Sequence, residues 1–312
     1  MKVKTLFLTN RDDASIEYLI GKYREYSDAY LRINSEDLEI LNFEVNPTGQ
    51  VRCFAEGEEY DFSDVKSVVF KRIPTKYNNP IGDENSAYLN NERKHFFEGI
   101  YLTLDHAKWV NPMFSTHIAE RKIYQLKVAS NLGLQIPKSI ITNKLHTALS
   151  FLDLQSKAII KPISNGLQVL KDKVYSIYTT EVTAREFRKL NLADTFSTPV
   201  FLQECIPNKY DIRVTIVGRS VFAVRISKDS KEVDWRKPDI VKSYQSMALP
   251  KSIIDKLLDL TSKFRMVYSA IDLIEMPNGE FIFLEINPVG EWVWLEQELG
   301  LNISEKIIQE LL

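Results

Sequence analysis

Two carboxylates and one amide stand in strongly apolar segments near the end of the chain. Asp272 lies within Ala-Ile-Asp-Leu-Ile, and Glu285 and Asn287 close the run Phe-Ile-Phe-Leu-Glu-Ile-Asn. Alternate residues of a strand share a face, so Glu285 and Asn287 should point the same way, with Asp272 across a hairpin from them. A charged carboxylate in such surroundings is costly unless it is paired or metal-bound. The alternative is that both carboxylates face solvent. This oxygen-only set suits Mg²⁺ or Mn²⁺ completed by nucleotide phosphates and water.

A lysine stands at the end of another expected buried strand. Lys161 follows Ala-Ile-Ile and precedes Pro162 and the small polar turn Ser164-Asn165-Gly166. An ammonium at this position, together with the backbone N–H groups of the turn, can bind a phosphate. Most lysines at strand ends are only solvated, so Lys161 is informative only beside other site residues.

Arginines mark a third group. Asp211 and Arg213 share one face of an expected strand, and Arg225 lies on the next strand of the same hairpin. We therefore expect Arg213 and Arg225 to converge, with Arg236 of Asp-Trp-Arg as a further candidate. Converging guanidinium groups bind phosphates or carboxylates through paired hydrogen bonds. Cross-strand ion pairing on a wet sheet face is the alternative.

The composition excludes several classes of protein. The 312 residues include only 11 glycines, and neither G-x-G-x-x-G nor G-x-x-x-x-G-K-[ST] occurs, which argues against a Rossmann dinucleotide site and a P-loop. The 40 basic and 42 acidic residues give a net charge of −2, which disfavours non-specific nucleic-acid binding. Two cysteines and four scattered histidines suit a reducing cytoplasm and provide no zinc site. No apolar run reaches the length of a membrane span.

Hydrophobic periodicity predicts alternating strands and helices, and therefore an α/β chain. The expected strands are 4–9, 29–33, 41–45, 51–54, 65–70, 139–142, 158–161, 169–170, 174–179, 200–204, 211–217, 220–226, 270–275 and 280–286. The expected helices are 14–26, 86–108, 115–132, 147–154, 251–266 and 303–311. We place an N-terminal α/β domain at 1–112, a central α+β domain at 113–199 and a C-terminal domain at 200–312.

The order of these residues resembles the ATP-grasp superfamily, in which two α+β lobes hold ATP between them. Within it, the chain is most similar to the ligases that mature graspetides, the microviridin-type ω-ester and ω-amide peptides. The resemblance runs nearly end to end and is most specific at Leu-Glu-Ile-Asn-Pro-Val-Gly-Glu-Trp, residues 284–292. Further matching segments are 32–37, 68–72, 109–112, 121–126, 161–162, 203–206, 211–213 and 234–236. Two positions depart from the family pattern: Lys71 replaces an arginine and Glu291 replaces a glutamine that is frequent in relatives.

The resemblance implies a role for each matching residue. Lys122 and Lys161 would contact the α- and β-phosphates of ATP, near the turn that holds Ser164 and Gly166. The hinge segment Gln203, Glu204 and Ile206 would hold adenine. Asp272, Glu285 and Asn287 would bind Mg²⁺. Arg213, Arg225 and Arg236 would contact the γ-phosphate or the acceptor carboxylate. Asp211 would contact the ribose or the substrate.

The implied reaction activates a Glu or Asp side chain of a precursor peptide, consisting of a leader and a core, as an acyl phosphate with release of ADP. A Ser or Thr hydroxyl or a Lys amine of the same peptide then closes a lactone or lactam. The central domain would act as the lid over ATP. Mn²⁺ is an alternative to Mg²⁺, and a homodimer, the number of rings and the identity of the peptide are left open by the sequence.

Two other functions stay open at this point. An amino-acid ligase similar to glutamate ligases would share the ATP core and differ only in its acceptor, which would be a small molecule or a protein tail. A non-catalytic sensor of peptide or nucleotide would keep the fold without turnover. The full set of lysines, arginines and carboxylates favours an enzyme over the sensor.

Overall fold

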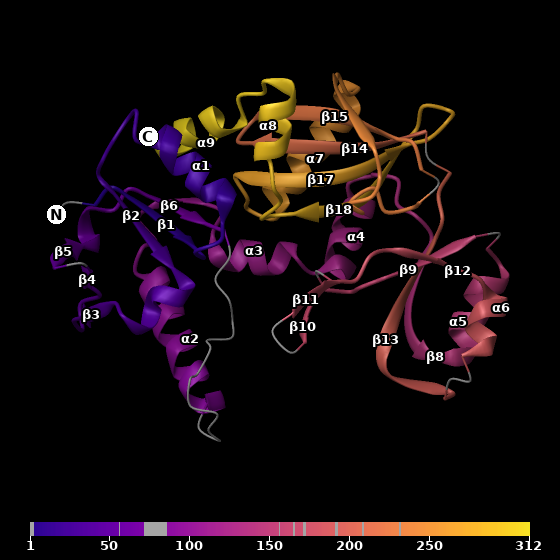
Figure 1. Ribbon diagram of the computed structural model, residues 1–312, viewed down its shortest axis with the longest axis horizontal. Helices are drawn as coiled ribbons and strands as arrows, with labels where there is room; N and C mark the ends of the chain where they lie inside the picture. Colours follow the sequence, from indigo (N-terminus) through magenta and orange to yellow (C-terminus); the bar gives the residue numbers. More distant parts are fainter. Residues whose placement is uncertain are drawn as a thin grey trace.

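The chain folds into three parts, each with its own sheet (Figure 1). The computed structural model describes residues 3–55, 57–71, 86–155, 157–164, 166–170, 173–190, 193–207, 209–230 and 232–312. The N-terminal part lies beside the C-terminal sheet, and the central part projects beneath the opposite end of that sheet. No helix in these ranges is long and apolar enough to cross a membrane.

The N-terminal sheet is parallel, in the order β2-β1-β6-β7. Its two inner strands read as nearly continuous apolar runs because α1 covers one face and α2 the other. The Asp13 carboxylate caps α1 by accepting a 3.1 Å hydrogen bond from the Ile16 N–H. The elements are β1 (Thr5–Thr9), α1 (Ala14–Tyr23), β2 (Tyr30–Asn34), the meander β3 (Asn42–Val45), β4 (Val51–Ala55) and β5 (Glu58–Asp61), then β6 (Ser67–Phe70), α2 (Ser86–Leu102) and β7 (Lys108–Val110).

The central part is an antiparallel sheet in the order β12-β9-β13-β8, packed on α5 and α6. A separate hairpin of β10 and β11 follows β9. A capping box between Thr183 and Glu186 starts α6. The elements are β8 (Ser139–Lys144), α5 (Leu145–Asp153), β9 (Ala158–Lys161), β10 (Leu167–Leu170), β11 (Lys173–Ser176), β12 (Thr180–Val182), α6 (Ala184–Lys189) and β13 (Thr195–Glu204).

The C-terminal sheet is antiparallel, in the order β16-β15-β14-β17-β18. Helices α4 and α7 pack on one face, while α8, α9 and the N-terminal part cover much of the other. The elements are α3 (Met113–Ala119), α4 (Lys122–Asn131), β14 (Tyr210–Val217), β15 (Ser220–Lys228), β16 (Lys242–Met247), α7 (Lys251–Lys263), β17 (Tyr268–Glu275), β18 (Phe281–Asn287), α8 (Val293–Leu299) and α9 (Ile303–Leu311).

Each expected strand overlaps a strand of the structure, but two expected helices are wrong in extent. The helix expected at 86–108 ends at Leu102, because Lys108 pairs with Ser67 as the start of a parallel edge strand. The helix expected at 115–132 is two helices, because Arg121 has an extended backbone (φ −83°, ψ 93°). The sequence pattern did not predict β5, β7, β12, β16, α6 or α8.

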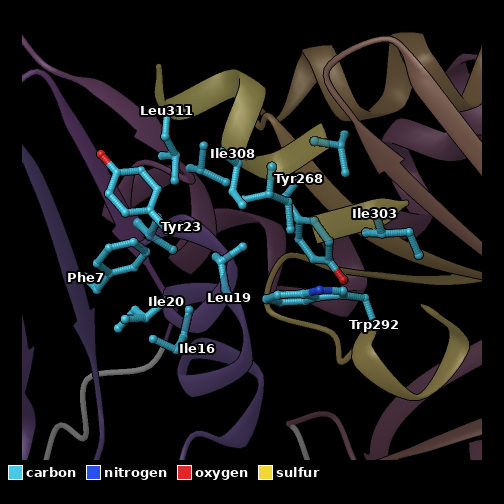
Figure 2. Close-up of a cluster of buried hydrophobic side chains, with 14 of the residues drawn as sticks. Phe7, Ile16, Leu19, Ile20, Tyr23, Tyr268, Trp292, Ile303, Ile308 and Leu311 are labelled. Atoms are coloured by element: carbon cyan, nitrogen blue, oxygen red, sulfur yellow. The ribbon is translucent and has the colours of Figure 1, made fainter. Parts of the chain in front are cut away.

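One hydrophobic core joins the two ends of the chain (Figure 2). Side chains of α1, such as Leu19 and Tyr23, meet side chains of α9, such as Ile308 and Leu311. Trp292 and Tyr268 extend this core onto the C-terminal sheet, with ring centroids 5.4 Å apart. The N-terminal part is therefore fixed to the C-terminal sheet by shared burial as well as by the chain.

A buried asparagine joins the same two parts through polar contacts. Asn111 Nδ2 donates to the Tyr268 and Pro288 carbonyls at 2.8 and 3.0 Å. Its Oδ1 accepts from the Val267 and Tyr268 N–H groups, both at 2.8 Å. All of the hydrogen-bonding capacity of this amide is used, as its burial requires.

A buried lysine adds an ion-pair cluster at this junction. Lys71 Nζ is 3.2 Å from Asp13 Oδ1 and 2.9 Å from Glu291 Oε2. It also lies 4.7 Å from the centroid of the Trp292 ring. Lys71 and Glu291, the two positions that depart from the family pattern, are thus direct partners across the junction.

Lys71→Met should destabilise the protein strongly. The substitution leaves the buried Asp13 carboxylate without its cation, a change that costs about 3–5 kcal/mol. Urea unfolding followed by circular dichroism measures the change in midpoint. Lys4→Met is the matched control, since Lys4 and Asp64 form a 3.8 Å pair that is more than a third exposed and is worth at most about 1 kcal/mol. Equal midpoints for the two variants would contradict a stabilising role for the cluster.

Candidate active site

One face of the C-terminal sheet brings together most of the predicted polar residues. Arg213 on β14 lies opposite Asp272 on β17, and Asp272 lies opposite Glu285 on β18. Residues that face each other across strands share a face, which also includes Asp211 and Asn287 by alternation. Arg213 Nε is 3.4 Å from Asp272 Oδ1. The predicted grouping of Asp272, Glu285 and Asn287 on one face is confirmed.

A β-bulge in β18 gives Glu285 its orientation. Asp272 pairs with Glu285, but the next pair is Leu273 with Phe283, so the register skips Leu284. Phe283 and Glu285 would share a face in a regular strand. Because of the bulge, Phe283 is fully buried in the core under α7 while Glu285 faces the other side.

Arg225 does not join this face, and the predicted convergence with Arg213 is wrong. The two-residue turn at Gly218 and Arg219 sets a register in which Arg225 pairs with Ile212, one residue away from Arg213. A shift of one residue in strand register places a side chain on the opposite face of the sheet. Arg225 instead donates to Glu275 at 2.8 Å and stacks 4.4 Å from the Tyr210 ring centroid. Its role is structural pairing on the opposite face.

The two facing carboxylates have opposite pKa shifts. Burial raises the pKa of Asp272, and the nearby Glu285 charge adds to this although Arg213 opposes it. Burial also disfavours ionisation of Glu285, but Lys122, Lys161 and Arg236 together outweigh it and lower its pKa. Glu285 is therefore the charged member around which the cations gather.

Two lysines from different parts of the chain reach this pair. Lys122 on α4 lies 3.3 Å from Glu285 Oε2 and donates to the Pro162 carbonyl at 3.0 Å. Lys161, at the end of β9, donates to Gln203 Oε1 at 3.0 Å and sits 4.7 Å from the Phe201 ring centroid. Burial, together with the charges of Lys122 and Arg236, lowers the pKa of Lys161 to about 8, although the Glu285 charge opposes the shift.

Arg236 approaches from the segment between β15 and β16. Its guanidinium binds the Asp234 carboxylate through two hydrogen bonds of 2.8 Å and lies 3.5 Å from Glu285 Oε1. The hydrogen bond to Asp234 raises the pKa of Arg236. Asp234 also accepts from the Thr179 N–H of the central part at 3.2 Å. Asp234, which the site prediction left out, therefore links the central part to Arg236; the Asp-Trp-Arg segment that resembles the family was its signal in the sequence.

The turn after β9 is narrow. Gly166 has φ +73°, and a Cβ there would lie 2.7 Å from the Ile177 carbonyl oxygen, so only glycine fits. Ser164 is exposed beside it, and Asn165 lies outside the described residues. The contacts of Ser164 and Gly166 with a phosphate stay a prediction.

The segment that joins the central and C-terminal sheets carries the expected hinge residues. Gln203 bridges Lys161 and Ser139, and its Nε2 donates to Ser139 Oγ at 2.9 Å. The Glu204 carboxylate accepts from the Lys138 N–H at 2.7 Å. Glu204 therefore fixes the chain at the hinge through its side chain.

A cleft of about 500 Å³ runs between the central and C-terminal sheets. Nine predicted site residues line it: Lys122, Lys161, Gln203, Glu204, Ile206, Asp211, Arg236, Asp272 and Glu285. Those that do not line it are Ser164, Gly166, Arg213, Arg225 and Asn287.

Asp211, which forms a 3.0 Å ion pair with Lys228, lies on the same wall of the cleft as Asp272. Lining residues that the prediction missed include Thr179 and Glu181, which lie in segments without a recognisable motif, and Asp234 of the Asp-Trp-Arg segment.

The donor set fits a metal only together with a second ligand. Among the described residues no group of three His, Cys, Asp or Glu could hold an ion. Asp272 and Glu285 provide two carboxylates, Asn287 an amide, and Asp272 Oδ1 is buried without a hydrogen bond. Oxygen ligands of this kind, too few to surround an ion, match Mg²⁺ that shares phosphate oxygens and water.

The comparisons with known proteins agree with this geometry. No known protein-family profile matches the chain. Macrocyclase MdnC of Microcystis aeruginosa, solved with precursor peptide MdnA, is 26% identical, with 99% of each chain covered and a TM-score of 0.85. A RiPP-associated ATP-grasp ligase of Chryseobacterium gregarium, solved with ADP and a leader and core peptide, is 24% identical over 99% of this chain and 96% of that one, with a TM-score of 0.86.

A curated relative matches a smaller part of the chain. The tetrahydromethanopterin:alpha-L-glutamate ligase of Methanocaldococcus jannaschii is 23% identical over 209 residues, which is 65% of this chain and 69% of the relative. The ATP-grasp fold and the ATP-grasp ligase class expected from the sequence are confirmed.

The low pKa of Lys161 predicts proton uptake when ADP binds. The lysine is mostly charged below pH 8 and mostly neutral above it, while a bound phosphate favours the charged form. Calorimetry at pH 8 in buffers of different ionisation enthalpy should show uptake of up to about half a proton, and affinity should fall up to about tenfold between pH 7 and 9.

Lys161→Met should remove both effects. Lys157→Met is the control, since Lys157 lines the same cleft and leaves Lys161 intact. An ADP affinity that does not change with pH in the unaltered protein would contradict a phosphate contact by Lys161.

Proposed function

We propose that this ATP-grasp ligase matures a ribosomally made peptide by closing macrolactone or macrolactam rings. The observation that carries the proposal is the Asp272–Glu285 pair in the cleft, surrounded by Lys122, Lys161 and Arg236. Oxygen ligands and phosphate-binding cations in one cleft are what ATP activation of a carboxylate requires. The peptide substrate is supported by the similarity to a peptide-bound macrocyclase, which spans 99% of the chain and includes its N-terminal part.

The nucleotide would lie along the cleft. Lys122 and Lys161 would balance the phosphate charge, next to the turn of Ser164 and Gly166. The hinge residues Gln203, Glu204 and Ile206 would hold adenine, with Asp211 near the ribose. Asp272, Glu285 and Asn287 would hold Mg²⁺, for which Mn²⁺ is a substitute of similar ligand preference. When bound, the metal would neutralise phosphate charge during phosphoryl transfer.

Arginines would orient the peptide carboxylate for attack on the γ-phosphate. Arg213 is buried, and its Nε and Nη1 make no hydrogen bond within the described part of the chain. Arg236 is held rigidly by Asp234 at the edge of the cleft. Attack by the carboxylate would release ADP, and attack by a Ser, Thr or Lys side chain on the acyl phosphate would release phosphate. Positioning and charge stabilisation account for catalysis here.

The proposed division of labour follows the three domains. Residues 113–199 would form the lid over the nucleotide and 200–312 the catalytic domain. Residues 1–112 would contribute to binding the peptide. An amino-acid ligase is the second candidate, favoured by the curated relatives, one of which is a glutamate ligase. Those relatives match only 65% of the chain, whereas the macrocyclase matches 99%.

Mass spectrometry separates these functions. The protein is incubated with ATP, Mg²⁺ and a short peptide rich in Thr, Ser or Lys and in Glu or Asp, encoded beside it. We expect ADP release that depends on the peptide and loss of one water mass per ring. A gain of one amino-acid mass on an acceptor would instead identify the amino-acid ligase. Tight ATP binding without turnover across many peptides would identify the sensor.

Glu285→Gln and Asn287→Ala should each abolish peptide-dependent ADP release. Glu285→Gln removes the charge of one candidate ligand. Asn287→Ala removes the amide oxygen of another, which also accepts from the Val289 N–H at 3.0 Å. Thermal denaturation checks that each variant is folded. Full activity in either folded variant would contradict the metal assignment.

Arg213→Lys and Arg225→Lys form a matched pair of substitutions on opposite faces of the sheet. The lysine at 213 keeps a charge but loses the planar donor array, so cyclisation should fall at least about tenfold. The lysine at 225 still pairs with Glu275, and activity should change by less than about threefold. Equal losses in the two variants would contradict the separation of the faces. Rates of ring closure and ADP affinity are the measurements.

A further inference from the structure

Gln125 is a buried amide that binds the backbone of the metal strand. Its Nε2 donates to the Ile286 carbonyl at 2.8 Å, and its Oε1 accepts from the Ile286 N–H at 3.2 Å. The same Nε2 also donates to the Ala119 carbonyl, at the end of α3. Only 3% of Gln125 is exposed. The side chain therefore pairs with both backbone polar groups of one residue, as a neighbouring strand would.

Strand β18 needs such a partner because it is the edge of the sheet. It stands last in the order β16-β15-β14-β17-β18, and the N–H and C=O of Ile286 lie on its open side, where they bond Gln125. An edge strand without partners slips or bends easily. The bulge at Leu284, two residues earlier, has already interrupted the ladder there. Gln125 completes the pairing just after this irregularity.

The residue that Gln125 holds lies between two candidate metal ligands. Ile286 separates Glu285 from Asn287, so fixing its peptide fixes the backbone from which both side chains project. Lys122, one turn earlier on α4, contacts Glu285 at 3.3 Å. One face of α4 thus binds the backbone of β18 and the carboxylate beside it.

We propose that Gln125 is a positioning residue that sets the orientation of Glu285 and Asn287 toward a divalent metal. This inference rests on the proposed function, since it requires the metal site. Partners behind metal ligands commonly influence metal affinity about 10–100-fold when they are removed. Gln125 acts through backbone geometry and contributes no ligand itself.

Manganese binding tests the proposal without turnover. Free Mn²⁺ is measured by electron paramagnetic resonance in the presence of the full chain and saturating ADP. Gln125→Met, which has a similar shape and no amide, should weaken Mn²⁺ binding about tenfold or more. ADP affinity measured with EDTA should stay within about threefold. Gln125→Asn keeps the amide but shortens the side chain, so it should give an intermediate loss of Mn²⁺ affinity. This variant replaces Gln125→Met in the test if the Met variant does not fold.

Thr261→Val is the matched control for a structural effect. Thr261 is equally buried on α7 and bonds Ser269 of β17 at 2.9 Å, away from the metal face. It should lower the melting temperature and leave Mn²⁺ affinity unchanged. If Gln125→Met also lowers only the melting temperature, the positioning role is overturned. If the unaltered protein binds ADP but no Mn²⁺, the proposed metal site is wrong. This outcome differs from a loss of Mn²⁺ affinity in the Gln125 variant alone, which supports the positioning role.

Discussion

Two carboxylates that face each other across neighbouring strands impose the main constraint on this structure. Asp272 and Glu285 are both largely buried, and a negative charge in such a place is tolerated only with cations around it. Those cations come from a helix, from a strand of another sheet and from a long connection: Lys122, Lys161 and Arg236. None of the three is near the pair in sequence. The charge of one strand pair therefore explains why separate parts of the chain meet at this cleft.

Much of the site was predictable because strand alternation is a local rule. The common face of Asp272, Glu285 and Asn287 and the strand ends at Lys161 followed from the pattern of apolar residues. The error at Arg225 came from register, which depends on where a hairpin turn begins and which a shift of one residue reverses. The bulge at Leu284 also has no signature in the sequence, since Phe-Leu-Glu reads as a regular strand.

Buried carboxamides were the least predictable part of the structure. Asn111 and Gln125 each substitute for backbone partners, one at the start of β17 and the other along β18. Both stand in largely apolar segments, Trp-Val-Asn-Pro-Met-Phe and Ile-Tyr-Gln-Leu, and nothing in these segments shows which backbone groups the amides will bond. The backbone groups that these amides bond depend on which strand lies beside them, and this is set by the packing of the sheets. The division of the helix at Arg121 has the same origin, because α4 turns toward β18.

The core in Figure 2 limits how this protein can be recombined with its relatives. The N-terminal part appears as an independent unit in sequence, yet α1 packs against α9, more than 250 positions later in the chain. Exchanging residues 1–112 between relatives would separate two halves of one packed interior. A segment exchange that keeps this core intact would have to include the N-terminal part together with Trp292 and α9. Substitutions in the core side chains of the N-terminal part therefore require matching changes in α9.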